Sequence, residues 1–246
     1  MIFYARPVAL HREQHRHLKF DSRPGDFGFA RNTNSILLAA SEIAEAARDY
    51  PVVFVGSPGG SFTLAALLGL RDGENLFVDA DGNWENGAYV PAFARRYPFI
   101  LAEADAGATD MTVCIDEACD RLGEETGEPL FDAEGKETPL LQSATDFLTL
   151  FHAEMQQTAL FAQTLFDAGL LVPKTIEVLR GERKHVLDGL FVIDRDKLAS
   201  LNDAGALALF RNGALSAVHA HLVSLGHIER LARRLDTRIE PAGAPE

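Results

Sequence analysis

One stretch of the chain, residues 143–170, constrains the fold more than any other. It contains no glycine before Gly169, and the first proline to follow is Pro173. Its large apolar side chains fall near one side of a helix with 3.6 residues per turn: Phe147, Phe151, Met155, Leu165 and Phe166. The sequence therefore predicts one long amphipathic helix, which begins near Ser143 and ends at Gly169 and Pro173.

The rest of the second half mixes strands with shorter helices. Apolar and β-branched residues predict strands at 174–179 and 190–193. The segment 194–196 is expected to open a short helix, and a last helix is predicted over 214–235. The tail 237–246 is rich in proline and alanine, so we expect it to fray.

The first half contains short apolar runs separated by turn residues. Runs at 51–55 and 111–115 are predicted to be strands. The runs 62–70 and 75–79 flank an Asp-Gly turn at 71–74, which predicts that they pair as a hairpin.

These patterns predict an α+β protein in which a β-rich first half, about 18–136, packs with a helix-rich second half, about 140–235. A chain of 246 residues can bury a sizeable core without disulfides or metals. We find no repeat or flexible linker, so the expectation is a single domain over 1–246.

The net charge of −13 is concentrated in one segment. Residues 102–138 contain twelve acidic side chains against Arg121 and Lys136. This segment is either a solvated surface or a patch that faces a basic partner or divalent cations. Nucleic acid is not an expected partner, because binding phosphates requires a basic surface that the chain lacks.

The chain also lacks the sequence signals of export and membrane insertion. The N-terminal residues 1–17 become charged and rich in histidine within about a dozen positions, unlike a signal peptide. No apolar run approaches the roughly 20 residues that span a bilayer. We therefore expect a cytoplasmic protein without membrane insertion.

Neither the cysteines nor the later histidines predict a metal site. Cys114 and Cys119 cannot complete a zinc site alone and are expected to be reduced thiols. His219 and His221 are two residues apart, so on a helix they point in different directions, and His227 lies too far along the axis. We expect no metal and no cofactor.

Other short motifs also fail the tests for known chemistry. The loop 56–61 lacks the Gly-Lys-Ser/Thr ending of a phosphate loop and is expected to be a hairpin loop. The segment 79–83 lacks the spacing of a calcium loop and is expected to be a tight turn. His15 and His17 would share a face only in a strand, and no third ligand is indicated. We predict no catalytic residues.

The best candidate for a binding surface is a group of aromatic and guanidinium side chains: Trp84, Tyr89, Arg95, Arg96 and Tyr97. Such side chains are frequent at interfaces and in anion-binding pockets. In an extended segment Arg95 and Arg96 would point to opposite sides, leaving one free for a protein partner or a small anionic ligand. The alternative is that the aromatic residues belong to the core and the arginines pair with the acidic segment.

Several motifs in the same order resemble the bacterial SapC family, over about 18–234. They are, in chain order, 69–79 (GLRDGENLFVD), Gly82, Trp84, 89–99 (YVPAFARRYPF), 127–131 (GEPLF), 189–193 (GLFVI) and 220–226 (AHLVSLG).

The resemblance implies a role rather than a mechanism. The family takes its name from a protein linked to a bacterial surface layer, and it offers no catalytic residues to carry over. We expect a non-enzymatic accessory or binding protein linked to cell-surface or surface-layer biogenesis. One alternative is a secreted surface-layer component. The other is an enzyme or cofactor-dependent modifying protein whose site is built from scattered residues, with His219 or His221 joining Tyr89, Arg95, Arg96 and Tyr97.

Overall fold

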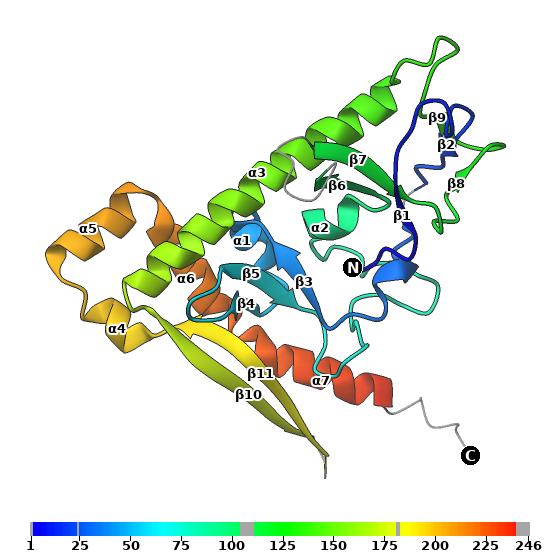
Figure 1. Ribbon diagram of the computed structural model, residues 1–246. Helices are drawn as coiled ribbons and strands as arrows, with labels where there is room; N and C mark the ends of the chain where they lie inside the picture. The colour runs from blue at the N-terminus through cyan, green and yellow to red at the C-terminus, as the bar shows by residue number, and fades with distance from the viewer. Residues whose placement is uncertain (1, 24, 104–110, 181–182, 240–246) are drawn as a thin grey trace, which may run out of the picture. The chain divides into compact units, whose positions relative to one another are not determined.

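The computed structural model describes residues 2–23, 25–103, 111–180 and 183–239 (Figure 1). Contacts within the chain divide it into two compact units. Unit 1 comprises Met1–Asp26 and Ala92–Ala153, and unit 2 comprises Phe27–Pro91 and Glu154–Glu246. The single domain expected from the sequence stays a prediction.

Unit 1 contains two small antiparallel sheets. The first, in the order β1-β7-β6, consists of β1 (Pro7–Ala9), β7 (Met111–Asp116) and β6 (Phe99–Glu103). The second, in the order β8-β2-β9, consists of β8 (Leu122–Gly123), β2 (Lys19–Phe20) and β9 (Glu128–Pro129). Strand β7 confirms the strand predicted over 111–115.

The core of unit 1 lies between these strands and the beginning of the helix α3 (Pro139–Asp167). Its buried members are all apolar: Phe20, Phe99, Ile115, Leu130, Phe131, Leu141 and Leu148. The rings of Phe20 and Phe99 meet edge to face with centroids 5.4 Å apart. Strand β2 thus places Phe20 in the core, while its neighbour Lys19 points to the other face.

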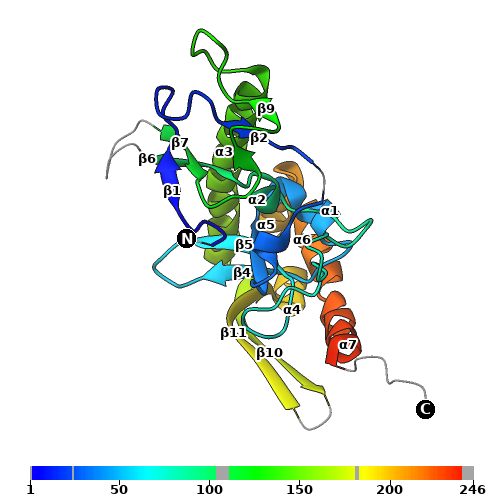
Figure 2. The same cartoon turned by 90° about the vertical axis from the view of Figure 1, so that its right-hand side faces the viewer.

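Unit 2 is organised around one antiparallel sheet in the order β10-β11-β4-β5-β3. Its strands are β3 (Ser35–Leu38), β4 (Val52–Gly56), β5 (Phe62–Leu67), β10 (Leu171–Arg180) and β11 (Arg183–Ile193). Strand β11 pairs with β4 only through Leu190 and Phe191. The outer part of β10 and β11 therefore forms a two-stranded ribbon that extends beyond the other strands of this sheet (Figure 2).

The strand pairing in unit 2 corrects one prediction. The loop at 57–61 joins β4 to β5, as expected for a hairpin loop. The predicted hairpin between 62–70 and 75–79 is wrong, because β5 is paired with β4 on one edge and with β3 on the other. Both edges of β5 are occupied, so residues 75–79 cannot add as a further strand.

The long helix predicted over 143–170 is confirmed as α3, which begins earlier, at Pro139. Proline is favoured in the first turn of a helix because its missing N–H needs no partner there. The helix ends at Asp167, and Gly169 follows with a φ of 72° that permits the reversal of the chain. The buried positions follow a helical repeat through both units: Leu141, Leu148, Phe151, Thr158, Ala162 and Leu165.

The remaining helices are short. The element α2 (Ala92–Arg95) belongs to unit 1. Unit 2 contains η1 (Gly28–Ala30), η2 (Ala40–Glu42), α1 (Ile43–Ala46), α4 (Arg195–Ala199), α5 (Asp203–Arg211), α6 (Ala214–Ser224) and α7 (His227–Ile239). Asp194 caps α4 by accepting from the backbone N–H groups of Asp196 and Lys197, which confirms the helix start expected at 194–196.

The last helix predicted over 214–235 is wrong in its extent. The structure divides it at Leu225 and Gly226 into α6 and α7, and α7 continues to Ile239. Glycine inside a helical pattern weakens the helix, and here it marks the break. The rest of the tail expected to fray, 240–246, lies outside the described residues.

The α+β class predicted from the sequence is confirmed, with most sheets in the first part of the chain and most helices in the second. None of the helices in the described ranges has both the length and the apolar character required to cross a membrane.

Candidate functional site

Trp84, the first residue of the predicted binding surface, lies in unit 2 and is buried. Its indole N–H donates to the hydroxyl of Tyr50 at 2.9 Å, and that hydroxyl donates in turn to the carbonyl of Tyr89. The ring of Phe27 contacts Trp84 edge to face at 5.6 Å. Trp84 therefore helps hold the loop before Tyr89 against the core of unit 2.

Tyr89 is tied to the same core at both ends. Its backbone N–H donates to a carboxylate oxygen of Asp49 at 2.8 Å, and its hydroxyl donates to Glu42 at 2.8 Å. The other oxygen of Glu42 accepts from the N–H of Ala39 at 2.8 Å. The carbonyl of Tyr89 accepts from the hydroxyl of Tyr50. Because burial raises the pKa of Tyr50, that hydroxyl keeps its proton and can donate at neutral pH.

Tyr97 lies in unit 1, where it contributes to a buried carboxylate site. Asp116 accepts from the N–H groups of Ala5 at 3.0 Å, Arg6 at 2.8 Å and Ala118 at 3.2 Å, and from the hydroxyl of Tyr97 at 3.2 Å. Burial alone would raise the pKa of Asp116, but the hydrogen bonds from these donors lower it by a larger amount. The pKa of Asp116 is therefore lower than usual, and the carboxylate remains ionised. The site fastens the N-terminal segment to β7.

Arg95 and Arg96 correct the expectation of an extended segment, because they lie at the end of the helix α2. Arg95 is exposed, with its guanidinium 5.3 Å from the ring centre of Phe147. Arg96 is largely buried among aromatic rings, at 3.9 Å from Phe93, 5.3 Å from Phe151 and 5.8 Å from Tyr4.

The electrostatic environment of Arg96 is unusual for a buried cation. Burial lowers the pKa of Arg96, and Tyr4 opposes this effect. Its Nε atom is buried and has no hydrogen-bond partner in the described part of the chain. The faces of aromatic rings stabilise a cation electrostatically, so they take the place that a carboxylate occupies beside most buried arginines.

The five predicted residues are thus distributed between the units. Trp84 and Tyr89 belong to unit 2, whereas Arg95, Arg96 and Tyr97 belong to unit 1. A ligand or partner surface that uses them stays a prediction.

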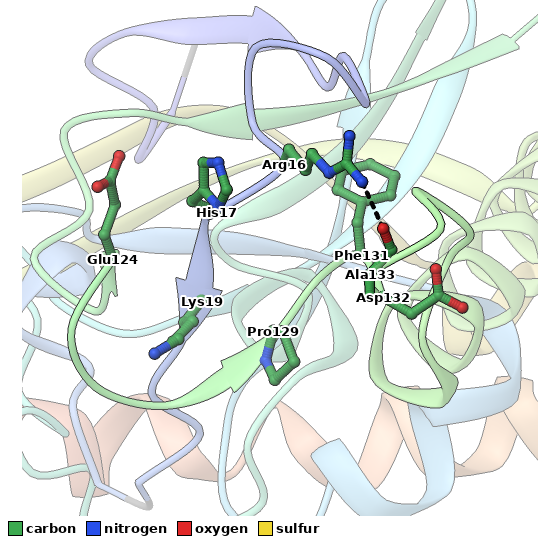
Figure 3. A pocket seen from close by; sticks show the side chains of 8 residues that line it. All are labelled: Arg16, His17, Lys19, Glu124, Pro129, Phe131, Asp132 and Ala133. Carbon is green, nitrogen blue, oxygen red and sulfur yellow. Dashed lines mark hydrogen bonds between the residues drawn. The ribbon is translucent and has the colours of Figure 1, made fainter.

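A groove in unit 1 offers a site that the sequence did not single out (Figure 3). Its cavity measures about 680 Å³. Its lining comes from β2 and the residues before it, from the residue after β8, and from β9 and the turn after it: Arg16, His17, Lys19, Glu124, Pro129, Phe131, Asp132 and Ala133. Lys19 is opposite Gly123 on one side and Pro129 on the other. Because glycine has no side chain, the surface beside Lys19 remains open.

The cations of this groove contact backbone carbonyls. The guanidinium of Arg16 donates to Ala133, and the ammonium of Lys19 donates to the carbonyl of Glu125 at 3.2 Å. In the described ranges neither Arg16 nor Lys19 has a carboxylate within ion-pair distance, and the same is true of His17.

The acidic side chains of the groove are less available. One oxygen of Asp132 accepts from the N–H groups of Glu134 at 3.0 Å and Lys136 at 2.8 Å, which stabilises the turn after β9. Glu124 lies on the far side of the groove from Arg16 (Figure 3). The groove therefore offers an anionic group the donors of Arg16, His17 and Lys19.

A second groove, of about 990 Å³, shares Phe131 with the first. Leu10, Met111 and Val113 give it apolar lining, and its charged lining is mixed, with His11, Arg12 and Lys136 beside Glu13 and Glu137. The segment 10–19 thus lines both grooves. Sequence reasoning considered His15 and His17 only as metal ligands, although the density of basic residues in 11–19 was a signal for an anionic ligand.

The histidines considered for metal binding are separated by burial. His221 is completely buried, and its Nε2 atom accepts from the N–H of Ile193 at 3.1 Å. Burial lowers the pKa of His221 to about 4. His219 is exposed. Within the ranges that the structure covers, no group of three or more metal-binding side chains is found. The absence of a metal or cofactor stays a prediction.

Comparison with known proteins assigns the chain to a sequence family. No curated protein and no solved structure matches it. The model of the SapC family matches residues 10–231, which is most of the chain. The chain therefore belongs to the SapC family.

Proposed function

We propose that this chain is a non-enzymatic binding protein of the cytoplasm, linked to cell-surface or surface-layer biogenesis. In this proposal the groove of unit 1 takes an anionic group, either from a small ligand or from a partner protein. Family membership supports the link to the cell surface, and the lining of the groove supports the class of ligand.

The observation that carries the proposal is the set of Arg16, His17 and Lys19 without carboxylate partners in the described ranges. In the described ranges Arg12, Arg23, Arg48, Arg71, Lys184 and Arg234 each have a carboxylate within ion-pair distance, whereas these three side chains do not. Cations that contact only carbonyls keep donors available for an incoming anion. Hydrogen bonds between such donors and a charged acceptor are the stronger kind.

The charge around the groove also limits what it can bind. Glu124 and Asp132 line the same surface and would repel an extended polyanion. A single carboxylate or phosphate group can contact the cations while avoiding these acids. The groove therefore favours a discrete anionic group, in agreement with the expectation that nucleic acid is not a partner.

The binding step is tested by titrating the full chain with inorganic phosphate and, separately, with acetate at constant ionic strength, followed by amide chemical shifts. We expect the shifts to concentrate around 16–19 and 129–133. The double variant Arg16→Gln, Lys19→Gln should weaken binding at least about tenfold, the effect of losing one charge-assisted hydrogen bond.

Arg48→Gln is the matched control, because Arg48 is an exposed arginine that pairs with Glu45 in unit 2. It should bind as the wild type does. Binding that is equally strong in the double variant would remove the groove from the proposal.

The biological part is tested in cells that lack the protein. The wild type and the Arg48→Gln control should restore the defect of the cell surface, whereas the groove variant at the same protein level should not. A cell-surface phenotype that the groove variant restores fully would contradict the proposed role of the groove.

A further inference from the structure

The groove beside β2 carries charges of both signs. Its lining includes two basic side chains, Arg16 and Lys19, and two acidic ones, Glu124 and Asp132. With His17 neutral, these charges cancel, so the groove is not simply a basic surface. A ligand is complementary to such a surface when it carries both signs itself, because each of its charges then meets an opposite one.

The two carboxylates of the groove differ in how far the protein already satisfies them. One oxygen of Asp132 accepts from the N–H groups of Glu134 and Lys136, so its own turn uses part of its capacity. Glu124 is exposed, and in the described ranges its carboxylate has neither a hydrogen bond nor an ion pair. Glu124 is therefore the better acceptor for a cationic group of a ligand.

The surface beside Glu124 has room for such a group. Gly123 precedes Glu124 and pairs with Lys19, and a Cβ atom at Gly123 would meet no atom within 4 Å. Pro129 and Phe131 add apolar lining against which a short hydrocarbon chain can pack. The cavity of about 680 Å³ falls in the range of small-molecule sites, about 300–1,000 Å³.

The strand order β8-β2-β9 keeps the ends of the groove apart. Glu124 directly follows β8, whereas Arg16 donates to the carbonyl of Ala133, in the turn after β9. Neighbouring strands lie about 4.8 Å apart, so β8 and β9 are about 10 Å apart across β2. Figure 3 shows Glu124 and Arg16 on opposite sides of the groove. Lys19 lies on the central strand.

We propose that the ligand of this groove is a small zwitterion. Its anionic group, a carboxylate or a phosphate, contacts Arg16 and Lys19, and its ammonium group contacts Glu124 several ångströms away. The inference rests on the proposed anion-binding function and adds the second half of the ligand. It gives Glu124 a role, because a carboxylate that would repel a simple anion attracts the ammonium group of a zwitterion.

The test compares two probes of equal length, 6-aminohexanoate and 6-hydroxyhexanoate, which differ in having an ammonium or a hydroxyl group opposite the carboxylate. An extended chain of this length separates its ends by about 7–8 Å. Each probe is titrated into the full chain at neutral pH and constant ionic strength, and amide chemical shifts are followed. We expect 6-aminohexanoate to bind about three- to fivefold more tightly, the upper range for an exposed ion pair. It should also shift the amides of 123–124, which 6-hydroxyhexanoate leaves in place.

Glu124→Gln should abolish this preference and should not weaken the binding of 6-hydroxyhexanoate, because the cations of the groove remain. Glu125→Gln is the matched control. It makes the same change of charge at the next exposed position, where the side chain is not part of the lining and only the carbonyl contacts Lys19. The control should keep the full preference for 6-aminohexanoate.

Two results would overturn the inference while leaving the anion site in place. The first is equal affinity of the wild type for the two probes. The second is a preference for 6-aminohexanoate that survives Glu124→Gln. If neither probe nor acetate binds at all, the proposed function fails, and the inference fails with it.

Discussion

The two units stabilise buried polar groups in different ways. In unit 2 the hydroxyl of Tyr50 links Trp84 to Tyr89, and Arg234 lies over Phe77 with Glu85 as its ion-pair partner. In unit 1 Asp116 gathers backbone N–H groups, while Arg96 lies among aromatic rings and has no ion pair in the described ranges. Both units thus use the same residue types, but Arg234 of unit 2 has a carboxylate beside its ring, whereas Arg96 of unit 1 has none within ion-pair distance among the described residues.

This difference shows why residue type alone does not identify a binding site. Tryptophan, tyrosine and arginine are enriched at interfaces, yet their polar groups also complete hydrogen bonds inside a core. What distinguishes the two cases is the partner of each polar group. The comparison between the units can be tested by removing those partners one at a time.

The largest effect is expected for Asp116→Ala in unit 1. The substitution leaves the N–H groups of Ala5, Arg6 and Ala118 without their acceptor, which should lower the free energy of unfolding by about 3–4 kcal/mol. Urea denaturation measures the change. Glu117→Ala is the control, because Glu117 is exposed and its carboxylate lies 3.7 Å from His15. Similar losses for both substitutions would show that the buried site is not the cause.

Acid should destabilise unit 2 through His221. Since its pKa falls from 6.5 to about 4 on folding, the neutral form is favoured in the folded protein. The free energy of unfolding is therefore highest above the ordinary pKa of histidine, 6.5, where His221 is neutral in both states. It decreases as the pH falls from 6.5 towards 4. At about pH 5 the loss should be about 2 kcal/mol.

The comparison of urea denaturation at neutral pH and near pH 5 checks this prediction. The loss should be smaller in His221→Gln and unchanged in His219→Gln, because His219 is exposed. Asp116 contributes at lower pH, because its pKa is lowered and its stabilising effect disappears only below the ordinary range of a carboxylate. Equal acid sensitivity in His221→Gln and the wild type would contradict the assignment to His221.

Removing one hydroxyl from each unit compares the two networks directly. Tyr50→Phe deprives both Trp84 and the carbonyl of Tyr89 of a partner, which should cost about 1.5 kcal/mol. Tyr97→Phe should cost less, because Asp116 keeps its three backbone donors. Thermal denaturation of the two variants measures the order. The reverse order would mean that Tyr97 is the more important hydroxyl.

Substitutions of Arg234 and Arg96, which both lie over aromatic rings, should change the free energy of unfolding by less. Arg234→Met removes a partly exposed ion pair with Glu85 and should cost about 1 kcal/mol or less. Arg96→Met should change stability by about 0.5 kcal/mol or less, because the methionine still fills the space between the rings while the buried charge is gone. Urea denaturation tests both.

A cellular assay adds the functional side of this comparison. If Arg96 belongs to a binding surface, as the sequence predicts, Arg96→Met should lose function while the fold is kept. Unchanged function in a stable Arg96→Met variant would make Arg96 part of the scaffold.

The smallest expected effect concerns the midpoints of thermal unfolding, which should be the same when two different probes are used. Trp84 is the only tryptophan, so its fluorescence reports on unit 2, whereas far-ultraviolet circular dichroism reports on the helices and strands of the whole chain. The single domain predicted from the sequence requires that the two thermal transitions coincide. Separate midpoints would show that the two units unfold independently.

The candidate site shows where sequence reasoning reaches its limit. The segment 84–99 was conspicuous because its aromatic residues and arginines are close in sequence. The groove brings Asp132 to Arg16 and Lys19, which are far from it along the chain, so no local pattern joined the two parts of its lining. The buried carboxylate of Asp116 was hidden for the same reason, since two of its three backbone donors come from Ala5 and Arg6.

The sequence by itself determined the features that depend on neighbouring residues. Apolar spacing placed α3 and the Asp194 cap placed α4, because each signal lies within one segment, and the order of several motifs along the chain placed it in the SapC family. The tertiary structure alone decided that β5 pairs with β3 as well as β4, that the helix after Gly213 divides at Gly226, and that Arg96 rests on rings. Those outcomes depend on residues that are distant in the sequence. A strand edge or a charged side chain can pair with any suitable group, and the fold decides which group lies next to it.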